Sequence, residues 1–276
     1  MTGRPVDGLD RERVERAVRP GWGQPLRVLP LVGSTQDEAL SWAREGAPEG
    51  SLVVADRQSA GRGRRGRTWH SPAGRSLYAS LLLRPRTGGA ALGVLTTAAG
   101  LAIAEAIEGL YALRAELKWP NDVTVGGRKL AGILVETVVA EGRAEIASVG
   151  MGINVSWTQE EFPRDVAPRA TSILLELERR GRGDLEPGRI ALLAAVLERL
   201  EVHYRSVRDG AGKDVIRGAA ARSAVLGRQV TVRLHGDKSC EGVATRLLES
   251  GALEIAARGR THVVHAGEIE RLLARG

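Results

Sequence analysis

A glycine- and arginine-rich loop between two apolar segments is the feature that most limits how this chain can fold. Residues 57–104 hold eight arginines and no Asp or Glu, a net charge of +8 against +7 for the whole chain. The charge is densest in residues 61–67, Gly-Arg-Gly-Arg-Arg-Gly-Arg. Glycines let a backbone bend closely around a ligand, and arginine forks match phosphate and carboxylate oxygens. Because buried strands are predicted on both sides, at 51–56 and 77–83, we expect a loop that holds an anion.

Composition places the chain among ordinary globular proteins. It has 276 residues, 43% hydrophobic and 26% charged, enough for one large domain and a small one. A single cysteine, Cys240, suits a reducing compartment, so we expect a cytoplasmic protein. Residues 1–24 lack an apolar signal core, and no segment approaches the roughly 20 apolar residues of a membrane span. No membrane partner is therefore expected.

Hydrophobic periodicity predicts a mixed α+β domain followed by a small β domain. Helices are predicted over residues 36–44, 92–113, 165–177 and 187–207. Strands are predicted over residues 26–31, 51–56, 77–83, 115–119, 130–139 and 144–155. From about residue 226, short alternating strands separated by turns indicate a barrel or sandwich. We divide the chain into a lead-in at 1–25, a catalytic or binding domain at 26–221 and a C-terminal domain at 222–276.

The arginine loop has several interpretations. Gly61, Gly63 and Gly66 satisfy the dinucleotide-binding pattern, but no helix follows them and no acid occurs before Glu105. Kinase and P-loop patterns are absent as well. A phosphorylated small molecule, a nucleic acid or no ligand at all remain, and the position between apolar strands favours the first. Trp69 could stack on a flat ring or pack in the core.

A second polar cluster follows the long helix. Lys118-Trp-Pro-Asn-Asp122 ends a strand in a turn, and two of the chain's four lysines, Lys118 and Lys129, lie in this region. Gly132 would weaken its strand unless something approaches it closely. A lysine, a carboxylate and a glycine at one edge suit a nucleotide and its Mg²⁺, although Asn121 and Asp122 are also ordinary turn residues.

Five motifs in order make a specific combination. They are Gly33-Ser-Thr, the segment from Gln58 to Arg67, Lys118–Asp122, Lys129-Leu-Ala-Gly-Ile-Leu-Val-Glu136 and Gly150-x-Gly-Ile-Asn154. Over roughly residues 26–276 the chain closely resembles biotin–protein ligases, also called biotin–[acetyl-CoA-carboxylase] ligases. The resemblance implies a class II synthetase-like mixed β-sheet with helices on one side and a small SH3-like β-barrel at the C-terminus.

The resemblance also implies a reaction and its partners. Biotin and ATP, with Mg²⁺, would give biotinyl-5′-AMP, and a lysine of a biotin carboxyl carrier protein domain, from acetyl-CoA carboxylase or a related carboxylase, would then take the biotinyl group. Some members carry an N-terminal winged-helix repressor domain. Only 32 residues precede Gly33 here, so we expect a monofunctional ligase without sequence-specific DNA binding. A homodimer is plausible because strand edges can pair across a two-fold axis.

The family match assigns roles residue by residue. The catalytic residues would be Arg64 and Lys129, and Mg²⁺ would be held or oriented by Asp122. Biotin would contact Ser34, Thr35, Gln58, Gly61, Arg62, Arg64, Lys129 and Gly132, with its apolar body near Gly132. ATP or the adenylate would contact Arg64, Arg67, Trp69, Lys118, Asn121, Asp122, Lys129 and Asn154. The loop 61–67 is expected to order over the adenylate and exclude water.

Other functions make different demands on the same residues. A lipoate–protein ligase shares the adenylation logic, but the arginine loop and the Ser34, Thr35 and Gln58 set favour a bicyclic ureido ligand. A nucleic-acid-binding protein would use aromatic side chains for stacking, and only Trp69 and Tyr78 accompany the arginines of residues 57–104. The five histidines and Cys240 form no metal-binding pattern.

Overall fold

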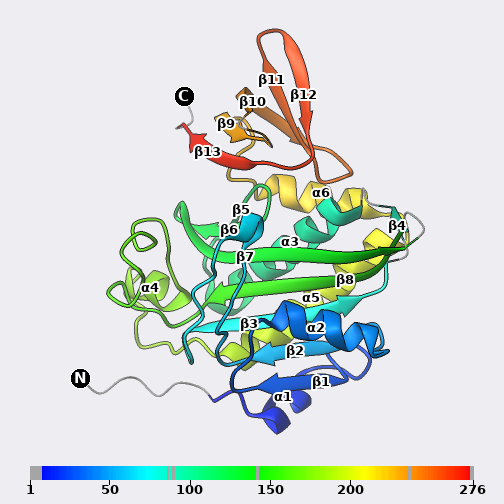
Figure 1. The fold of residues 1–276 in the computed structure, drawn as a ribbon. Helices are drawn as coiled ribbons and strands as arrows, with labels where there is room; N and C mark the ends of the chain where they lie inside the picture. The colour runs from blue at the N-terminus through cyan, green and yellow to red at the C-terminus, as the bar shows by residue number, and fades with distance from the viewer. Residues whose placement is uncertain are drawn as a thin grey trace.

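The computed structural model describes residues 8–85, 87–88, 91–140, 143–234, 236 and 238–273, with nothing to state for the side chains of 87–88, 91–92 and 143. An eight-stranded sheet has the order β1-β2-β3-β8-β7-β6-β5, with β4 paired to β8, and a five-stranded sheet follows (Figure 1). The start of the predicted lead-in (residues 1–7), His235 and residues 274–276 lie outside the described residues.

The main sheet is mixed, as predicted. Its strands are β1 Leu26–Leu29, β2 Leu52–Ala55, β3 Ser76–Leu83, β4 Thr87–Gly88, β5 Glu116–Lys118, β6 Asp122–Val125, β7 Arg128–Ala140 and β8 Arg143–Asn154. β1 and β2 run parallel, and the remaining neighbours are antiparallel. The sequence did not identify β4 or β6, both of which are short.

Helices cover both faces of this sheet, which refines the expectation of helices on one side. Their bounds are α1 Arg11–Ala17, α2 Thr35–Arg44, α3 Ala91–Tyr111, α4 Ile173–Glu178, α5 Arg189–Arg208 and α6 Gly212–Ala221. Leu52 and Val54 of β2 pack with α3 and α5, whereas Val53 packs beneath α2 on the opposite face. Because both faces of β2 are covered, its sequence is a continuous apolar run.

The predicted helix at 165–177 is wrong over its first eight residues. The helix begins at Ile173, where Ser172 caps it by accepting a hydrogen bond from the Leu175 N–H. The preceding segment instead pairs with the start of β7: Ala170 bridges Lys129 in parallel. This tertiary pairing overrides local helical spacing. The sequence also missed α6, which contains two glycines.

Helix α3 is the central core helix. Its stretch Gly93–Tyr111 is long and apolar enough to cross a membrane by length and composition, so the expectation that no segment comes near this was wrong. The core helix of a soluble protein passes the same test, and here Leu95, Ala99 and Ile103 are fully or almost fully buried against the sheet and the neighbouring helices.

The C-terminal sheet has a core of its own, consistent with the expected small barrel. Its strands are β9 Gln229–Arg233, β10 Ser239–Leu247, β11 Leu253–Ala257, β12 Arg260–Val264 and β13 Glu268–Leu272, of which β13 was not predicted. Trp119, from the turn between β5 and β6, packs in this core, and its indole Nε1–H donates to the Gly251 carbonyl at 3.1 Å. The domain boundary at 221/222 stays a prediction.

A buried carboxylate fixes the segment that supports Lys129. Glu176 of α4 is 1% exposed and accepts hydrogen bonds from Thr171 Oγ1 at 2.7 Å and from Arg128 and Arg180 at 2.8 Å. Burial on its own would raise the pKa of Glu176, but these hydrogen bonds outweigh it and lower the pKa to about 2.

We expect Glu176 to contribute acid-sensitive stability. Because its folded-state pKa lies below the usual 4.5, the contribution is complete above pH 4.5 and is lost as the pH falls towards 2. Replacing Glu176→Gln should lower the free energy of unfolding at pH 7 by about 3 kcal/mol, and the gap to the unmodified protein should close in acid. Urea unfolding at several pH values measures this, with the exposed Glu160→Gln as control. A gap that does not change with pH would contradict it.

Candidate active site

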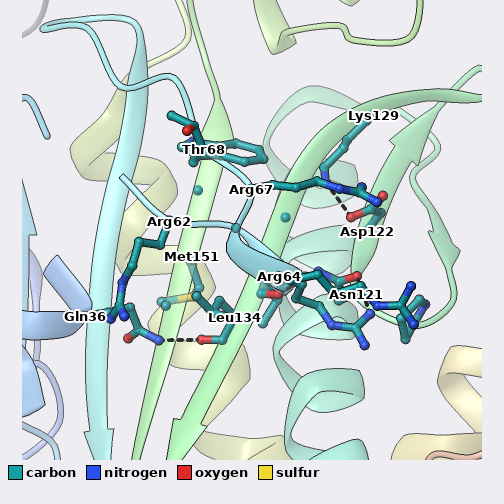
Figure 2. Close-up of a pocket in the computed structure, with 18 of the residues that line it drawn as sticks. Gln36, Arg62, Arg64, Arg67, Thr68, Asn121, Asp122, Lys129, Leu134 and Met151 are labelled. Carbon is teal, nitrogen blue, oxygen red and sulfur yellow. Dashed lines mark hydrogen bonds and ion pairs between the residues drawn. The ribbon is translucent and has the colours of Figure 1, made fainter. Parts of the chain in front are cut away.

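One cavity gathers most of the predicted site residues. It lies between α2, the arginine loop, β6 to β8 and the start of β13, with an empty volume of ≈ 1000 Å³ that includes its open mouth (Figure 2). Gly61 and Asn154 are the predicted residues absent from its lining. The lining includes Ser34, Thr35, Gln58, Arg62, Arg64, Arg67, Trp69, Lys118, Asn121, Asp122, Lys129 and Gly132.

A partly buried hydrogen-bond chain forms one end of the cavity. Ser34 caps α2 by accepting from the Gln36 N–H. The Thr35 N–H donates to Gln58 Oε1 at 2.9 Å, and the Thr35 hydroxyl donates to the same oxygen at 3.2 Å. Gln58 Nε2 in turn donates to Ser71 Oγ at 2.9 Å. The Gln58 amide is therefore fixed in orientation, as recognition of a polar ring requires.

Glycines of β7 and β8 form a flat floor on which Trp69 lies. A Cβ at Gly152 would come within 2.6 Å of the Trp69 ring, and one at Gly132 within 3.0 Å. Gly132 and Gly152 are direct cross-strand partners. The Trp69 ring and the Lys129 side chain lie next to Gly132, where the resemblance places the apolar body of biotin, and that placement stays a prediction.

The arginine loop is a closed, tightly bent structure. Arg62 and Thr68 pair across its base, and the Gly63 N–H donates to the Arg67 carbonyl at 2.6 Å. Arg64–Gly66 form a single 3-10 turn in which Arg65 has a left-handed φ of 58° and Gly66 one of 71°. Gly61 lies just behind it, where a Cβ would meet the Trp69 carbonyl at 2.5 Å. The loop therefore needs its glycines for close approach as well as for bending.

Three loop arginines form ion pairs with carboxylates in other parts of the chain. Arg62 forms ion pairs with Asp37 at 2.7 Å and Glu136 at 2.8 Å. Arg67 forms an ion pair with Glu268, which also pairs with Arg233 at 2.9 Å. The bond from Arg67, with help from Arg233, lowers the pKa of Glu268 to about 2. Arg65 donates to the Arg233 carbonyl at 3.3 Å. The C-terminal sheet thus holds the far side of the loop.

Arg64 points into the centre of the cavity. Its guanidinium donates to Asn121 Oδ1 at 3.2 Å and to the Gly267 carbonyl at 3.3 Å (Figure 2). Burial, followed by the nearby charge of Arg65, lowers the pKa of Arg64, although a guanidinium stays protonated in proteins. Neither of these hydrogen-bond partners is a carboxylate, so this partly desolvated cation is well placed to bind an anion.

Lys129 and Asp122 face each other across β6 and β7. Lys129 Nζ lies 2.7 Å from Asp122 Oδ1 and 5.2 Å from the centre of the Trp69 ring. The described residues contain no group of three or more acidic, histidine or cysteine side chains that could hold a metal ion. With Asp122 paired to Lys129 and Glu268 to arginines, the cavity does not fit a resident Mg²⁺ cage; Mg²⁺ arriving with ATP is part of the substrate. The role of Asp122 stays a prediction.

Asn154 lies away from the cavity lining. It is 5% exposed, and its amide donates to the Thr171 carbonyl at 3.0 Å and accepts from Ser76 Oγ at 3.3 Å. In this structure Asn154 joins the end of β8 to the segment before α4. Its predicted contact with the nucleotide remains untested.

Several lining residues were not predicted from the sequence. They include Gln36, Thr68, Leu134, Gly150, Met151, Gly152 and Glu268. The Gly150-x-Gly152 pair was a usable signal, because two glycines in a central strand indicate close approach of another group. Glu268 had no such signal.

Comparison with known proteins identifies the family. Residues 28–154 match the Biotin/lipoate A/B protein ligase family. The biotin–[acetyl-CoA-carboxylase] ligase of Mycobacterium tuberculosis is 36% identical over 280 residues, covering 95% of this chain and 99% of that protein. This chain belongs to the biotin/lipoate A/B protein ligase family.

Solved structures of this family share the fold. The biotin protein ligase from Aquifex aeolicus in complex with biotin and ATP superposes with a TM-score of 0.76 at 31% identity, covering 90% of this chain and 98% of that one. The bifunctional ligase/repressor BirA of Bacillus spizizenii is 41% identical over 151 residues, which are 55% of this chain and 46% of BirA. The match thus spans about half the length of that relative.

Proposed function

We propose that this chain activates biotin with ATP and transfers it to a lysine of a biotin carboxyl carrier protein domain. The observation that carries the proposal is one cavity that holds the fixed Thr35–Gln58 amide pair at one end and Arg64 and Lys129 at the other. The Aquifex relative of similar length has been solved with biotin and ATP bound.

In the first step a biotin carboxylate oxygen attacks the α-phosphorus of ATP. The new P–O bond gives biotinyl-5′-AMP, and the bond to the β-phosphate oxygen breaks to release pyrophosphate with its Mg²⁺. Two anions must meet, so fixed positive charge is the main requirement. Arg64 would bridge the carboxylate and phosphate oxygens, and Lys129 would leave Asp122 to join them.

In the second step the neutral ε-amine of the carrier lysine attacks the acyl carbon of the mixed anhydride. An amide bond forms, the bond to the phosphate oxygen breaks, and AMP leaves with its oxygen as the amine loses a proton. No nucleophile from this chain is needed. The closed loop 61–67 would keep water from the anhydride meanwhile.

Mass spectrometry tests the proposal. A carrier domain incubated with this protein, MgATP and biotin should gain one biotinyl group on a single lysine, and omission of ATP should abolish the gain. Because the family includes lipoate ligases, a parallel reaction with lipoate is the control. A gain with lipoate alone would assign the lipoate activity, and no gain with either ligand on a competent carrier would refute both.

A further inference from the structure

Gln36, the second residue of α2, forms a wall of the cavity. Its side chain lies between α2 and the β7–β8 pair, beside Leu134 and Met151 (Figure 2). Nε2 donates to the Leu134 carbonyl at 2.8 Å and to the Ser148 carbonyl at 3.3 Å, and Oε1 accepts from Ser148 Oγ. Both amide protons are thus used within the protein, and the residue is only 4% exposed. Gln36 is a fixed surface, not a free donor for a ligand.

Gly150 of β8 makes room for this amide. A Cβ at Gly150 would lie 2.7 Å from Gln36 Cδ, closer than real Cβ atoms come to other heavy atoms, and 3.0 Å from Oε1. The cavity side of β8 therefore carries Gln36 at Gly150 and Trp69 at Gly152, each flat against backbone. Neither side chain can sink further towards the strand.

Gln36 lies at the end of the cavity opposite Lys129. Its neighbour Thr35 bonds Gln58, and those two residues are the ones we assign to the ligand's ring. A rigid wall beside the ring limits ring size, whereas a wall beside Lys129 would limit chain length. The position of Gln36 thus points to discrimination at the ring.

We propose that Gln36, seated on Gly150, determines specificity by limiting the size of the ring that enters the cavity. This inference rests on the proposed biotin activity. Its physical basis is that a buried side chain held by three hydrogen bonds cannot yield to a larger ligand without giving up its bonds to the Leu134 and Ser148 carbonyls and to Ser148 Oγ.

The first test compares biotin with an analogue that carries one methyl group on a ureido nitrogen. The ratio of kcat/KM values for biotin and the analogue is measured by pyrophosphate release. In Gln36→Ala this ratio should fall by about tenfold, because one carbon atom more or less in a binding pocket typically changes discrimination between substrates by about this factor. Gln24→Ala, which also removes a side-chain bond to backbone carbonyls but lies outside the cavity lining, should keep the ratio of the unmodified protein. An unchanged ratio in Gln36→Ala overturns the inference.

The second test uses the contact with Gly150. Gly150→Ala should raise KM for biotin by about tenfold because the new methyl group pushes the Gln36 amide into the cavity. In the Gln36→Ala background the same change should have little effect, since nothing is left to displace. Simple addition of the two effects would overturn the seating of Gln36 on Gly150.

The two proposals fail separately. If the unmodified protein releases no pyrophosphate with biotin, the proposed function fails. If the unmodified protein does release pyrophosphate with biotin, but Gln36→Ala leaves the ratio of kcat/KM values unchanged, only the proposed role of Gln36 fails. Thermal unfolding of each variant identifies any that does not fold. If Gly150→Ala does not fold, the specificity ratio of Gln36→Ala alone still tests the role of Gln36.

Discussion

Replacing Arg64→Ala should lower the rate of biotinyl-5′-AMP formation by about 10²–10³-fold. Arg64 is the partly desolvated loop cation that points into the cavity, and it donates to the Asn121 side-chain oxygen and the Gly267 carbonyl, neither of which is a carboxylate. A positive charge fixed there stabilises the negative charge on the oxygens of the pentacoordinate transition state at phosphorus. It is already in place and does not have to reorganise during the reaction. The loss should appear in kcat, measured as biotin-dependent pyrophosphate release at saturating MgATP.

The matched control is Arg57→Ala. Arg57 belongs to the same +8 segment, but its side chain is exposed and outside the cavity lining. The Arg57→Ala variant loses the same net charge as Arg64→Ala but keeps the cation in the cavity. Its rate of biotinyl-5′-AMP formation should therefore stay close to that of the unmodified protein at moderate salt. Equal losses in the two variants would mean that the general field of the segment, and not the position of Arg64, accelerates the reaction.

Replacing Trp119→Ala should lower the free energy of unfolding by about 3–5 kcal/mol, as for other large buried side chains. Trp119 is 7% exposed and belongs to the core of the C-terminal sheet, although the chain places it next to Pro120 and Asn121 of the cavity. We expect adenylate formation to fall as well, because the turn that holds Asn121 loses its anchor. Urea unfolding and pyrophosphate release measure the two effects.

Trp119→Phe and Trp42→Ala complete the comparison. The phenyl ring keeps most of the packing and loses the bond to the Gly251 carbonyl, so it should cost about 0.5–1.5 kcal/mol. Trp42 is half-buried on α2, with Arg27 over its ring at 4.3 Å, and its removal should cost less than that of Trp119. A Trp119→Ala protein as stable as Trp42→Ala would show that the two sheets do not share this core residue.

The sequence predicted elements well where burial alone decides their form. The segments that form β2, β3 and β8 are apolar because other elements cover both of their faces. An apolar run can be recognised from neighbouring residues alone. The start of α4 was misjudged because its preceding residues pair with Lys129, about 40 positions earlier in the chain. That contact cannot be read from periodicity.

The site shows the same division. Sequence motifs contain most of the residues that line the cavity. They did not show why glycine is needed at particular positions of the lining. Gly150 and Gly152 need empty space because Gln36 and Trp69 arrive from segments far earlier in the chain. Arg67 was predicted to contact ATP or the adenylate, but its ion pair was not foreseen, because its partner Glu268 lies 201 residues away in a strand that the sequence did not reveal. Distant pairing sets these features, and only a folded chain displays it.

The placement of Trp69 gives the protein an optical reporter. Its indole lies on the Gly152 backbone, with Lys129 Nζ 5.2 Å from the ring centre and its Nε1 buried without a hydrogen-bond partner. A ligand that enters the cavity changes the polarity around this ring and moves the nearest cation, so indole emission should shift on filling. With Trp42 replaced by phenylalanine, the remaining tryptophans at 22, 119 and 157 are almost completely buried, and a stopped-flow fluorimeter could then time ligand entry directly.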